Sequence, residues 1–202
     1  MQVRQLAVEG ALEFTPDVFP DERGLFVSPF QGPAFRDAVG GDHFPVAQSN
    51  HSESRRGVVR GIHYTTTPPG MAKYVYCATG EAIDIVVDIR VGSPTFGKWD
   101  AVHMDQRHFR GMYFPVGVGH AFVALGDRTV MSYILTGSYV PAHEQALAVL
   151  DPALGLPIPE GIEPVLSERD RVAITLAEAA ERGVLPDYHQ CKLIEKQLMG
   201  GR

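Results

Sequence analysis

The sequence predicts an all-β protein, a sandwich or barrel of short strands followed by short helices. The 21 glycines and 15 prolines are spread along the 202 residues and divide the middle of the chain into short runs separated by turn signals. In the clearest run, Glu81–Arg90, isoleucine and valine alternate with residues that include two aspartates, which is the period of a strand. Residues 165–202 differ, because Thr175–Glu178 is a capping box that opens a helix to about Arg182 and Gln190–Met199 indicates a second helix.

Length and composition indicate one globular domain. A chain of 202 residues is long enough to bury a core, and 45% hydrophobic with 21% charged residues is typical of a soluble protein. No apolar run approaches the length of a membrane span, and Met1–Arg4 begins no secretory signal. We therefore expect a single domain over residues 1–202 and no membrane partner.

Charge and cysteine usage narrow the possible partners and the compartment. The formal net charge of −6 disfavours nucleic-acid binding, which requires a basic face. Cys77 and Cys191 form neither a disulfide framework nor a metal motif. A reducing, cytoplasmic compartment is the simplest expectation.

The N-terminal segment predicts strands, a turn and a helix. Val3–Phe14 has the composition of one or two opening strands. Phe19–Gly24 is a turn that leads into the apolar run Leu25–Val27. Gly32–Gly41 predicts a short helix that carries Phe35.

The segment Val58–Tyr64 predicts a strand that carries the first candidate catalytic residue, His63. Alternation places His63 on the same face as Gly61, where a ligand has room to approach the imidazole, and places Arg60 on the opposite face. A histidine in an open slot is a candidate base, and a hydrogen-bonded core histidine is the alternative.

The following strands hold a tyrosine in apolar surroundings. Ala121–Leu125 and Thr129–Leu135 predict a hairpin around Gly126-Asp127. Tyr133 shares a face of the second arm with Met131, which is typical of a core tyrosine whose hydroxyl is bonded to a neighbour.

Two carboxylates have ordinary structural roles as their first interpretation. Asp84 lies in the middle of the alternating strand, so we expect it to be solvated, with a polar cavity as the alternative. Ser167–Asp170 fits a capping box, so Asp170 is expected to cap a turn or short helix.

The pattern Pro115-x-Gly117-x-x-His120 is similar to the second half of the cupin signature. The first half is absent, because a cupin metal site needs His-x-His, whereas His63 is followed by Tyr64 and Thr65. A lone histidine is a poor ligand set for a transition metal. We therefore expect a cupin-like jelly roll without a catalytic metal.

Other familiar chemistries lack their motifs. No glycine-rich phosphate loop precedes a helix, and no G-x-S-x-G elbow is present. Histidine, tyrosine, lysine and carboxylate side chains can still remove and return a proton next to a carbonyl group, which requires no cofactor.

Several motifs together resemble one enzyme family. They are Asp21-x-Arg23-Gly24-x-Phe26, Gln48-x-Asn50-x-Ser52, Gly57-Val-Val-Arg60-Gly61-x-His63-Tyr64, Lys73, Asp84-x-x-x-Asp88-x-Arg90-x-Gly92-Ser93-Pro94-Thr95-Phe96-Gly97, Pro115-x-Gly117-x-x-His120, Tyr133 and Asp151-Pro152. The chain resembles the dTDP-4-dehydrorhamnose 3,5-epimerase family, nucleotide-sugar epimerases that act on dTDP-4-keto-6-deoxyhexoses. The match covers a core of about residues 1–155, and Leu166-Ser-x-x-Asp170 extends it into the helical extension 165–202.

The resemblance implies catalytic roles for four side chains. His63 matches the base that takes the proton next to the C4 ketone, and Asp170 matches the carboxylate that orients it. Tyr133 matches the acid that donates a proton from the opposite face of the sugar. Lys73 matches the position that stabilises the enolate oxygen. Such stabilisation is needed because the proton next to the ketone is only weakly acidic.

The resemblance also implies a set of substrate-binding side chains for the nucleotide and the sugar. The implied residues are Arg23, Phe26, Gln48, Asn50, Arg60, Asp84, His120 and Tyr139. Arg60 conflicts with strict alternation, so either Gly61 marks a β-bulge or Arg60 reaches the ligand from a strand end. The family is dimeric through pairing of its N-terminal strands, so a homodimer is implied as well.

Two departures indicate a branch of the family. Ser28 stands where the family usually has glutamate, and Thr65 stands where it usually has glutamine. These features are similar to the epimerases of antibiotic deoxysugar pathways. Our first expectation is an enzyme that inverts C5, and our second is one that inverts both C3 and C5. The alternatives are a C3-only epimerase, a 3,4-ketoisomerase and a non-catalytic sugar-binding cupin.

Overall fold

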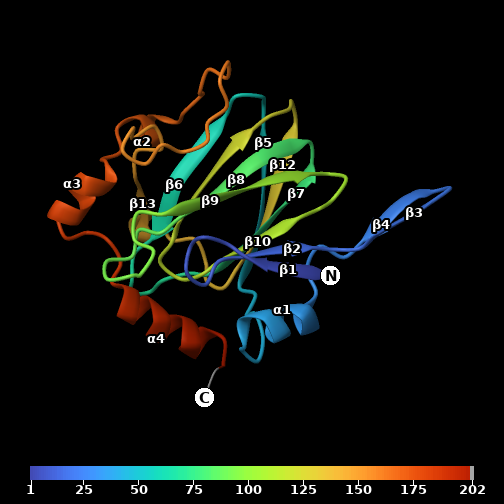
Figure 1. Cartoon of the computed structure of the whole chain (residues 1–202), viewed down its shortest axis with the longest axis horizontal. Coiled ribbons are helices and arrows are strands. Elements are labelled where there is room, and N and C mark those ends of the chain that lie inside the picture. The colour runs from blue at the N-terminus through green and yellow to red at the C-terminus, as the bar shows by residue number, and fades with distance from the viewer. Residues whose placement is uncertain (201–202) are drawn as a thin grey trace.

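A computed structural model describes residues 1–200 as two β-sheets packed face to face (Figure 1). One sheet has six strands in the order β1 (Gln2–Gln5), β2 (Leu12–Thr15), β10 (Gly111–Phe114), β7 (Lys73–Thr79), β12 (Thr129–Leu135) and β5 (Gln48–Ser54). The other has five strands in the order β13 (Glu144–Ala146), β6 (Val59–Thr65), β11 (Gly119–Ala124), β8 (Glu81–Val87) and β9 (Trp99–Asp105). The expected all-β, cupin-like jelly roll is confirmed.

The main core lies between the two sheets. It takes Val75, Met112 and Met131 from the six-stranded sheet and Val86 and Phe122 from the five-stranded sheet. A sheet-to-sheet core of this kind requires apolar side chains on one face of every strand, which explains the alternation in the sequence.

The outer face of the five-stranded sheet is also buried. Ile85 and Val87 of β8 pack there with Leu147 and with Leu176, which the C-terminal part of the chain supplies. The expectation that Asp84 is solvated is therefore wrong, because both faces of β8 are covered and Asp84 is 0% exposed.

The expected hairpin of β11 and β12 is also wrong. Both edges of β11 are occupied, by β6 and β8, and β12 pairs with β5 and β7 in the other sheet. The turn around Gly126-Asp127 therefore carries the chain from one sheet to the other.

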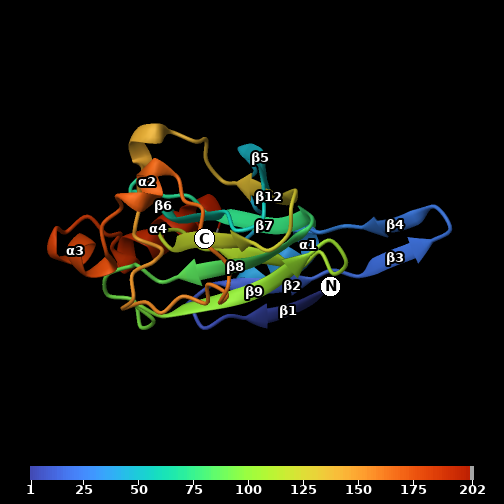
Figure 2. The same cartoon turned by 90° about the horizontal axis from the view of Figure 1, so that it is seen from above.

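The N-terminal segment contains a hairpin that projects from the body of the molecule (Figures 1 and 2). It consists of β3 (Val18–Asp21) and β4 (Gly24–Val27), which pair with each other alone among the described residues. Phe19, Leu25 and Phe26 are exposed on it. The predicted N-terminal strands are confirmed, but the turn expected over Phe19–Gly24 is confined to Glu22-Arg23, because Phe19–Asp21 belong to β3.

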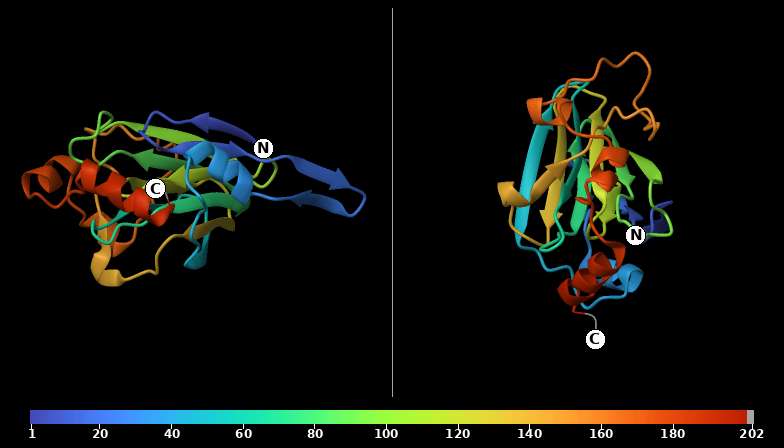
Figure 3. Two further views of the ribbon diagram at one scale, coloured as in Figure 1. Left: turned by 90° about the horizontal axis from the view of Figure 1, so that it is seen from below. Right: turned by 90° about the vertical axis from the view of Figure 1, so that its left-hand side faces the viewer.

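The expected helices are present, and they pack against the outer faces of the two sheets. They are α1 (Gly32–Val39), a 3₁₀ turn (Pro141–His143), α2 (Glu168–Arg171), α3 (Leu176–Glu181) and α4 (Tyr188–Leu198). The capping box of α3 and a helix over most of Gln190–Met199 are confirmed. The segments that follow α1 and α4 meet through a hydrogen bond from Asp42 N–H to Met199 O, and the two helices lie side by side (Figure 3). Within residues 1–200, no helix is long and apolar enough to cross a membrane.

Candidate active site

A pocket of about 150 Å³ lies between the two sheets and collects most of the predicted site residues. Its lining is Asn50, Arg60, His63, Met71, Lys73, His120, Phe122, Tyr133, Leu135, Tyr139, Glu144 and Arg169. Each sheet supplies one wall, so a ligand in this pocket has groups from β6 and β11 on one side and from β7 and β12 on the other.

A β-bulge in β6 brings Arg60 and His63 to the same wall. In the pairing with β11, His63 lies opposite His120 and Arg60 lies opposite Phe122, so β6 spans three residue steps where β11 spans two. The extra residue reverses the alternation between the two side chains. Of the two explanations for Arg60, the bulge at Gly61 is confirmed.

His63 forms a dyad with Asp170. The Nε2 atom of His63 lies 2.6 Å from Oδ1 of Asp170, whose side chain is buried, while the imidazole remains partly exposed to the pocket. Burial raises the pKa of Asp170, but the hydrogen bond and charge of His63 together with hydrogen bonds from Ser167 and Gly61 outweigh it, and the pKa is lowered. With the carboxylate accepting from Nε2–H, Nδ1 is the basic nitrogen of the neutral ring.

The surroundings of the dyad keep His63 available as a base. Burial lowers the pKa of His63, and the hydrogen bond with Asp170 opposes that effect only in part. The expectation that Asp170 caps the helix is wrong, because Ser167 is the cap: its Oγ accepts a hydrogen bond from the Asp170 backbone N–H at 3.1 Å. The cap fixes the backbone of α2, and the Asp170 side chain is free to meet His63.

Tyr133 lies on the opposite wall, on β12. Its hydroxyl is 2.6 Å from Ser52 Oγ on the neighbouring strand β5. Burial raises the pKa of Tyr133 to about 12, while the hydrogen bond with Ser52 acts in the other direction. The side chain is therefore a neutral phenol at any physiological pH.

Lys73 contributes a partly buried ammonium group from β7. Burial lowers the pKa of Lys73, and the negative charges of Glu144 and Asp84 raise it. No hydrogen bond or ion pair within residues 1–200 engages its Nζ, so the group is free to bind an anionic oxygen in the pocket.

His120 and Asp84 form a second pair beside the first. His120 Nε2 lies 2.6 Å from Asp84 Oδ1, and Oδ2 of Asp84 is buried without a partner among the described residues. Burial raises the pKa of Asp84, and His120 opposes this effect. The ring of His120, the histidine of the cupin-like spacing, also packs against Phe114, with ring centroids 4.2 Å apart.

Three further predicted residues stand at the rim of the pocket. Gln48 Nε2 donates to Asn50 Oδ1 at 2.7 Å, and Gln48 Oε1 accepts from the backbone N–H of Tyr139 at 2.8 Å. Tyr139 is half exposed, so its ring is open for stacking.

Arg23 and Phe26 lie outside the pocket of their own chain. Both belong to the projecting β3–β4 hairpin, where Arg23 pairs with Asp21 and Phe26 is 67% exposed. The motif identifies these two residues, but it does not indicate that the hairpin carries them away from the pocket of their own chain.

Sequence reasoning gave no role to three residues at the site. Ser52 lies within a recognised motif, while Glu144 and Arg169 line the pocket. Arg169 precedes Asp170 and Glu144 lies opposite Thr65 on β6, so their positions follow from those neighbours. Thr65 Oγ1 donates to Glu144 Oε1 at 2.7 Å.

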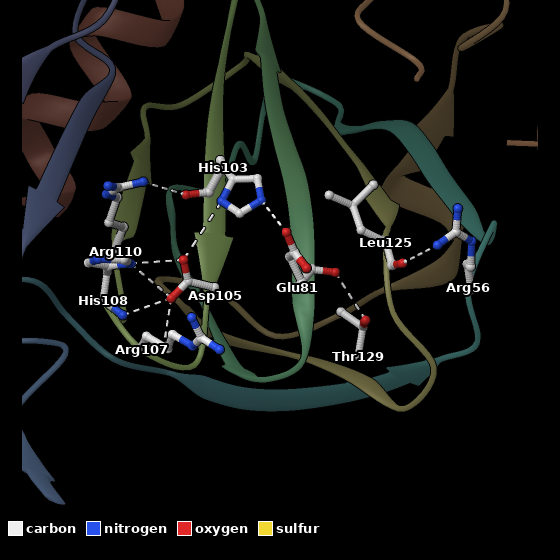
Figure 4. Close-up of polar contacts among 9 residues, drawn as sticks. All are labelled: Arg56, Glu81, His103, Asp105, Arg107, His108, Arg110, Leu125 and Thr129. Carbon is white, nitrogen blue, oxygen red and sulfur yellow. Dashed lines mark hydrogen bonds and ion pairs between the residues drawn. The ribbon is translucent and has the colours of Figure 1, made fainter. Parts of the chain in front are cut away.

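A second cluster of titratable groups lies at one end of the β8–β9 pair, away from the pocket (Figure 4). His103 Nε2 is 2.6 Å from Glu81 Oε1, and His108 Nδ1 is 2.9 Å from Asp105 Oδ2. Partial burial raises the pKa of Asp105, but hydrogen bonds from His108 outweigh it and lower the value to about 2. The two histidines are well exposed, so solvent screens their ion pairs, and these pairs contribute little to the stability of the fold.

Comparison with known proteins agrees with the motifs. Residues 5–178 match a family model described as dTDP-4-dehydrorhamnose 3,5-epimerase. A dTDP-4-dehydrorhamnose 3,5-epimerase of Streptomyces griseus is 46% identical over 196 residues, which cover 97% of each chain. A dTDP-4-dehydro-6-deoxyglucose 3-epimerase of Streptomyces bikiniensis is 48% identical over 91% of this chain and 93% of its own.

The fold agrees with the same assignment. The crystal structure of a 3'-monoepimerase from Streptomyces bikiniensis in complex with dTDP-quinovose superimposes with a TM-score of 0.92 at 44% identity, covering 98% of this chain and 100% of that chain. The chain belongs to the dTDP-4-dehydrorhamnose 3,5-epimerase family.

Proposed function

We propose that this protein is a cofactor-independent epimerase of a dTDP-linked 4-keto-6-deoxyhexose in a deoxysugar pathway of the kind that makes antibiotics. One observation carries the proposal: the His63–Asp170 dyad and the Tyr133 phenol stand on opposite walls of one pocket. A base on one face of a sugar ring and an acid on the other are what inversion at a carbon requires.

His63 removes the proton from a ring carbon next to the C4 ketone. The C–H bond breaks, its electron pair forms the enolate, and the proton moves to Nδ1 of His63. Asp170 stabilises the imidazolium, as the carboxylate of a His–Asp pair does. Tyr133 then transfers its hydroxyl proton to the same carbon from the other face, and the ketone re-forms with the configuration inverted.

Lys73 stabilises the enolate oxygen. A proton next to a ketone is too weakly acidic for imidazole to remove unless the developing negative charge is met by a fixed positive group. The Lys73 ammonium is partly buried, and it has no competing hydrogen-bond partner among the described residues. His120, held by Asp84, adds a second polar group to the sugar pocket.

The nucleotide lies at the rim, where Gln48, Asn50 and Arg60 supply polar groups and Tyr139 stacks on the base. We propose a homodimer in which the neighbouring chain's β3–β4 hairpin brings Arg23 and Phe26 to this rim. The exposed Phe19, Leu25 and Phe26 support that arrangement, since exposed apolar groups on one hairpin are typical of an interface.

The relatives narrow the position of inversion. The names of the two enzymes quoted above state inversion at C3 alone or at both C3 and C5. These names favour a reaction that includes C3, with C5 as the second position. We also propose a cytoplasmic location, supported by two buried cysteines that form no disulfide.

Proton NMR of dTDP-4-keto-6-deoxyglucose with the protein in deuterated water tests this function. The expected result is loss of the C3–H signal, or of both C3–H and C5–H, together with formation of an inverted product. Migration of the ketone to C3 would instead make the protein a 3,4-ketoisomerase. Tight binding without any exchange would make it a non-catalytic sugar-binding protein.

A further inference from the structure

The hydroxyl of Tyr133 has one hydrogen-bond partner within residues 1–200, Ser52. The two oxygen atoms are 2.6 Å apart. Ser52 lies two residues after Asn50 on β5, so both side chains point to the face that borders the pocket. In the β5–β12 pairing Asn50 lies directly opposite Tyr133, and Ser52 reaches the phenol from the diagonal position.

The contact bears on how Tyr133 can deliver a proton. If Tyr133 donated its hydrogen to Ser52, that hydrogen would point away from the sugar. If Ser52 donates instead, the phenol hydrogen is free to point into the pocket. A serine hydroxyl can do either, because it rotates to suit its surroundings.

We propose that Ser52 is a positioning residue for Tyr133, whose hydroxyl donates a hydrogen bond to the phenol oxygen and so directs the phenol proton toward the sugar. This inference rests on the proposed role of Tyr133. During the transfer the Tyr133 O–H bond breaks and a C–H bond forms, with the electron pair coming from the enolate. The phenolate that remains keeps the hydrogen bond from Ser52, and it regains a proton from solvent.

The hydrogen bond contributes more to the transition state than to the ground state. A hydrogen bond to an ionised oxygen is about twice as strong as one between neutral groups. Because only interactions that strengthen along the reaction accelerate it, Ser52 is expected to act on the rate of inversion and not on substrate binding. Burial of Tyr133 increases the need for this bond, since it disfavours the phenolate.

Two rates in deuterated water test the proposal. Return of deuterium by His63 labels recovered substrate without inversion, whereas delivery by Tyr133 produces inverted sugar. For Ser52→Ala we expect inversion to slow by about 10- to 100-fold, the loss of one hydrogen bond to a charged group, with KM unchanged and labelling of recovered substrate retained. Ser52→Thr, which keeps a hydroxyl, is expected to restore most of the inversion.

The matched control is Ser49→Ala, on the same strand but exposed and without a side-chain hydrogen bond among residues 1–200. It is expected to behave as the unmodified protein does. Equal slowing of labelling and inversion in Ser52→Ala, or no slowing of either, would overturn the role of Ser52. Absence of both reactions in the unmodified protein would instead overturn the proposed function, so the two failures are distinguishable.

Discussion

His63, Lys73 and Tyr133 lie in one pocket, where burial lowers the pKa of His63 and of Lys73 and raises the pKa of Tyr133. The pKa of His63 falls below the ordinary histidine value of 6.5, so the imidazole is neutral at pH 7. The pKa of Lys73 falls below 10.5, and that of Tyr133 rises to about 12. These directions leave the His63 imidazole able to accept a proton and the Tyr133 phenol able to donate one near neutral pH, while the negative charges of Glu144 and Asp84 favour the charged form of Lys73.

These directions, which belong to the free protein, predict a bell-shaped dependence of kcat/KM on pH. Activity requires neutral His63, so it is lost as the pH falls through a value below 6.5. It also requires charged Lys73, so it is lost as the pH rises through a value below 10.5, before Tyr133 titrates. Initial rates over pH 5–10 check this, and an alkaline limb that persists unchanged in Lys73→Arg would assign that limb to another group.

Glu144 provides a sharper form of the same test. Its charge raises the pKa of Lys73, so Glu144→Gln is expected to move the alkaline limb to lower pH and leave the acid limb in place. Glu168→Gln is the control, because that carboxylate lies on the exposed side of α2.

At the scale of elements, the bulge in β6 decides which side chains meet. Gly61 has φ of +127°, and a Cβ atom there would lie 2.5 Å from Ala121 Cβ. Gly61→Ala is expected to cost about 2–5 kcal/mol of stability through strain and overpacking. Urea denaturation measures the cost, with Gly126→Ala as the control because a Cβ there meets nothing closer than 3.7 Å. A loss of stability no larger than that of Gly126→Ala would contradict this account of the bulge.

Helix α4 docks through a buried carboxyl group. Glu195 accepts a hydrogen bond from the Tyr113 hydroxyl, while its Oε2 is buried without a partner among the described residues. Burial raises the pKa of Glu195, so the folded protein binds this proton more tightly than the unfolded chain does. Stability contributed here is present below the unfolded value of 4.5 and is lost as the pH rises through the folded pKa.

Glu195→Gln is therefore expected to gain Tm relative to the unmodified protein as the pH rises from 4.5 to 8, since it carries no charge to bury. Thermal melts across this range measure the difference. The exposed Glu181→Gln on α3 is the control. A difference in Tm that stays constant with pH would show that Glu195 does not titrate over this range.

Across the whole molecule, local features can be predicted from the sequence, but contacts between distant segments cannot. Periodicity and capping residues identify β8, α3 and α4, because those signals are local. Pairing is not local: the hairpin expected for β11 and β12 failed because strands distant in sequence occupy both edges of β11. The burial of Asp84 was missed because segments beyond residue 140 cover the apolar Ile85 and Val87 face of β8, which leaves the face that carries Asp84 and Val86 turned toward the six-stranded sheet.

The site shows the same limit. A family motif indicates His63, Tyr133 and Asp170, but the one-residue shift in β6 that aligns Arg60 with His63 has no signal in composition. Arg23 and Phe26 are the clearest case, since their proposed role depends on a second copy of the chain.

Mixing two inactive variants tests that dimer. In a dimer of one His63→Asn chain and one Arg23→Ala chain, one pocket has an intact His63 and receives an intact Arg23 from its neighbour. We therefore expect activity to return when the two variants are mixed and allowed to exchange subunits. If Arg23 acted in its own chain, no pocket would have both residues and mixing would restore nothing.

In the proposed mechanism one proton leaves on the His63 side of the sugar and a different proton arrives on the Tyr133 side. A single turnover of substrate deuterated at C3 and C5, with enzyme in excess in ordinary water, tests it most directly by the isotope content of the inverted carbon. The two-sided mechanism predicts inverted product that carries hydrogen from solvent and none of the original deuterium at that carbon. Retention of the original deuterium in inverted product would mean that one group performs both transfers, and would contradict the two-sided mechanism.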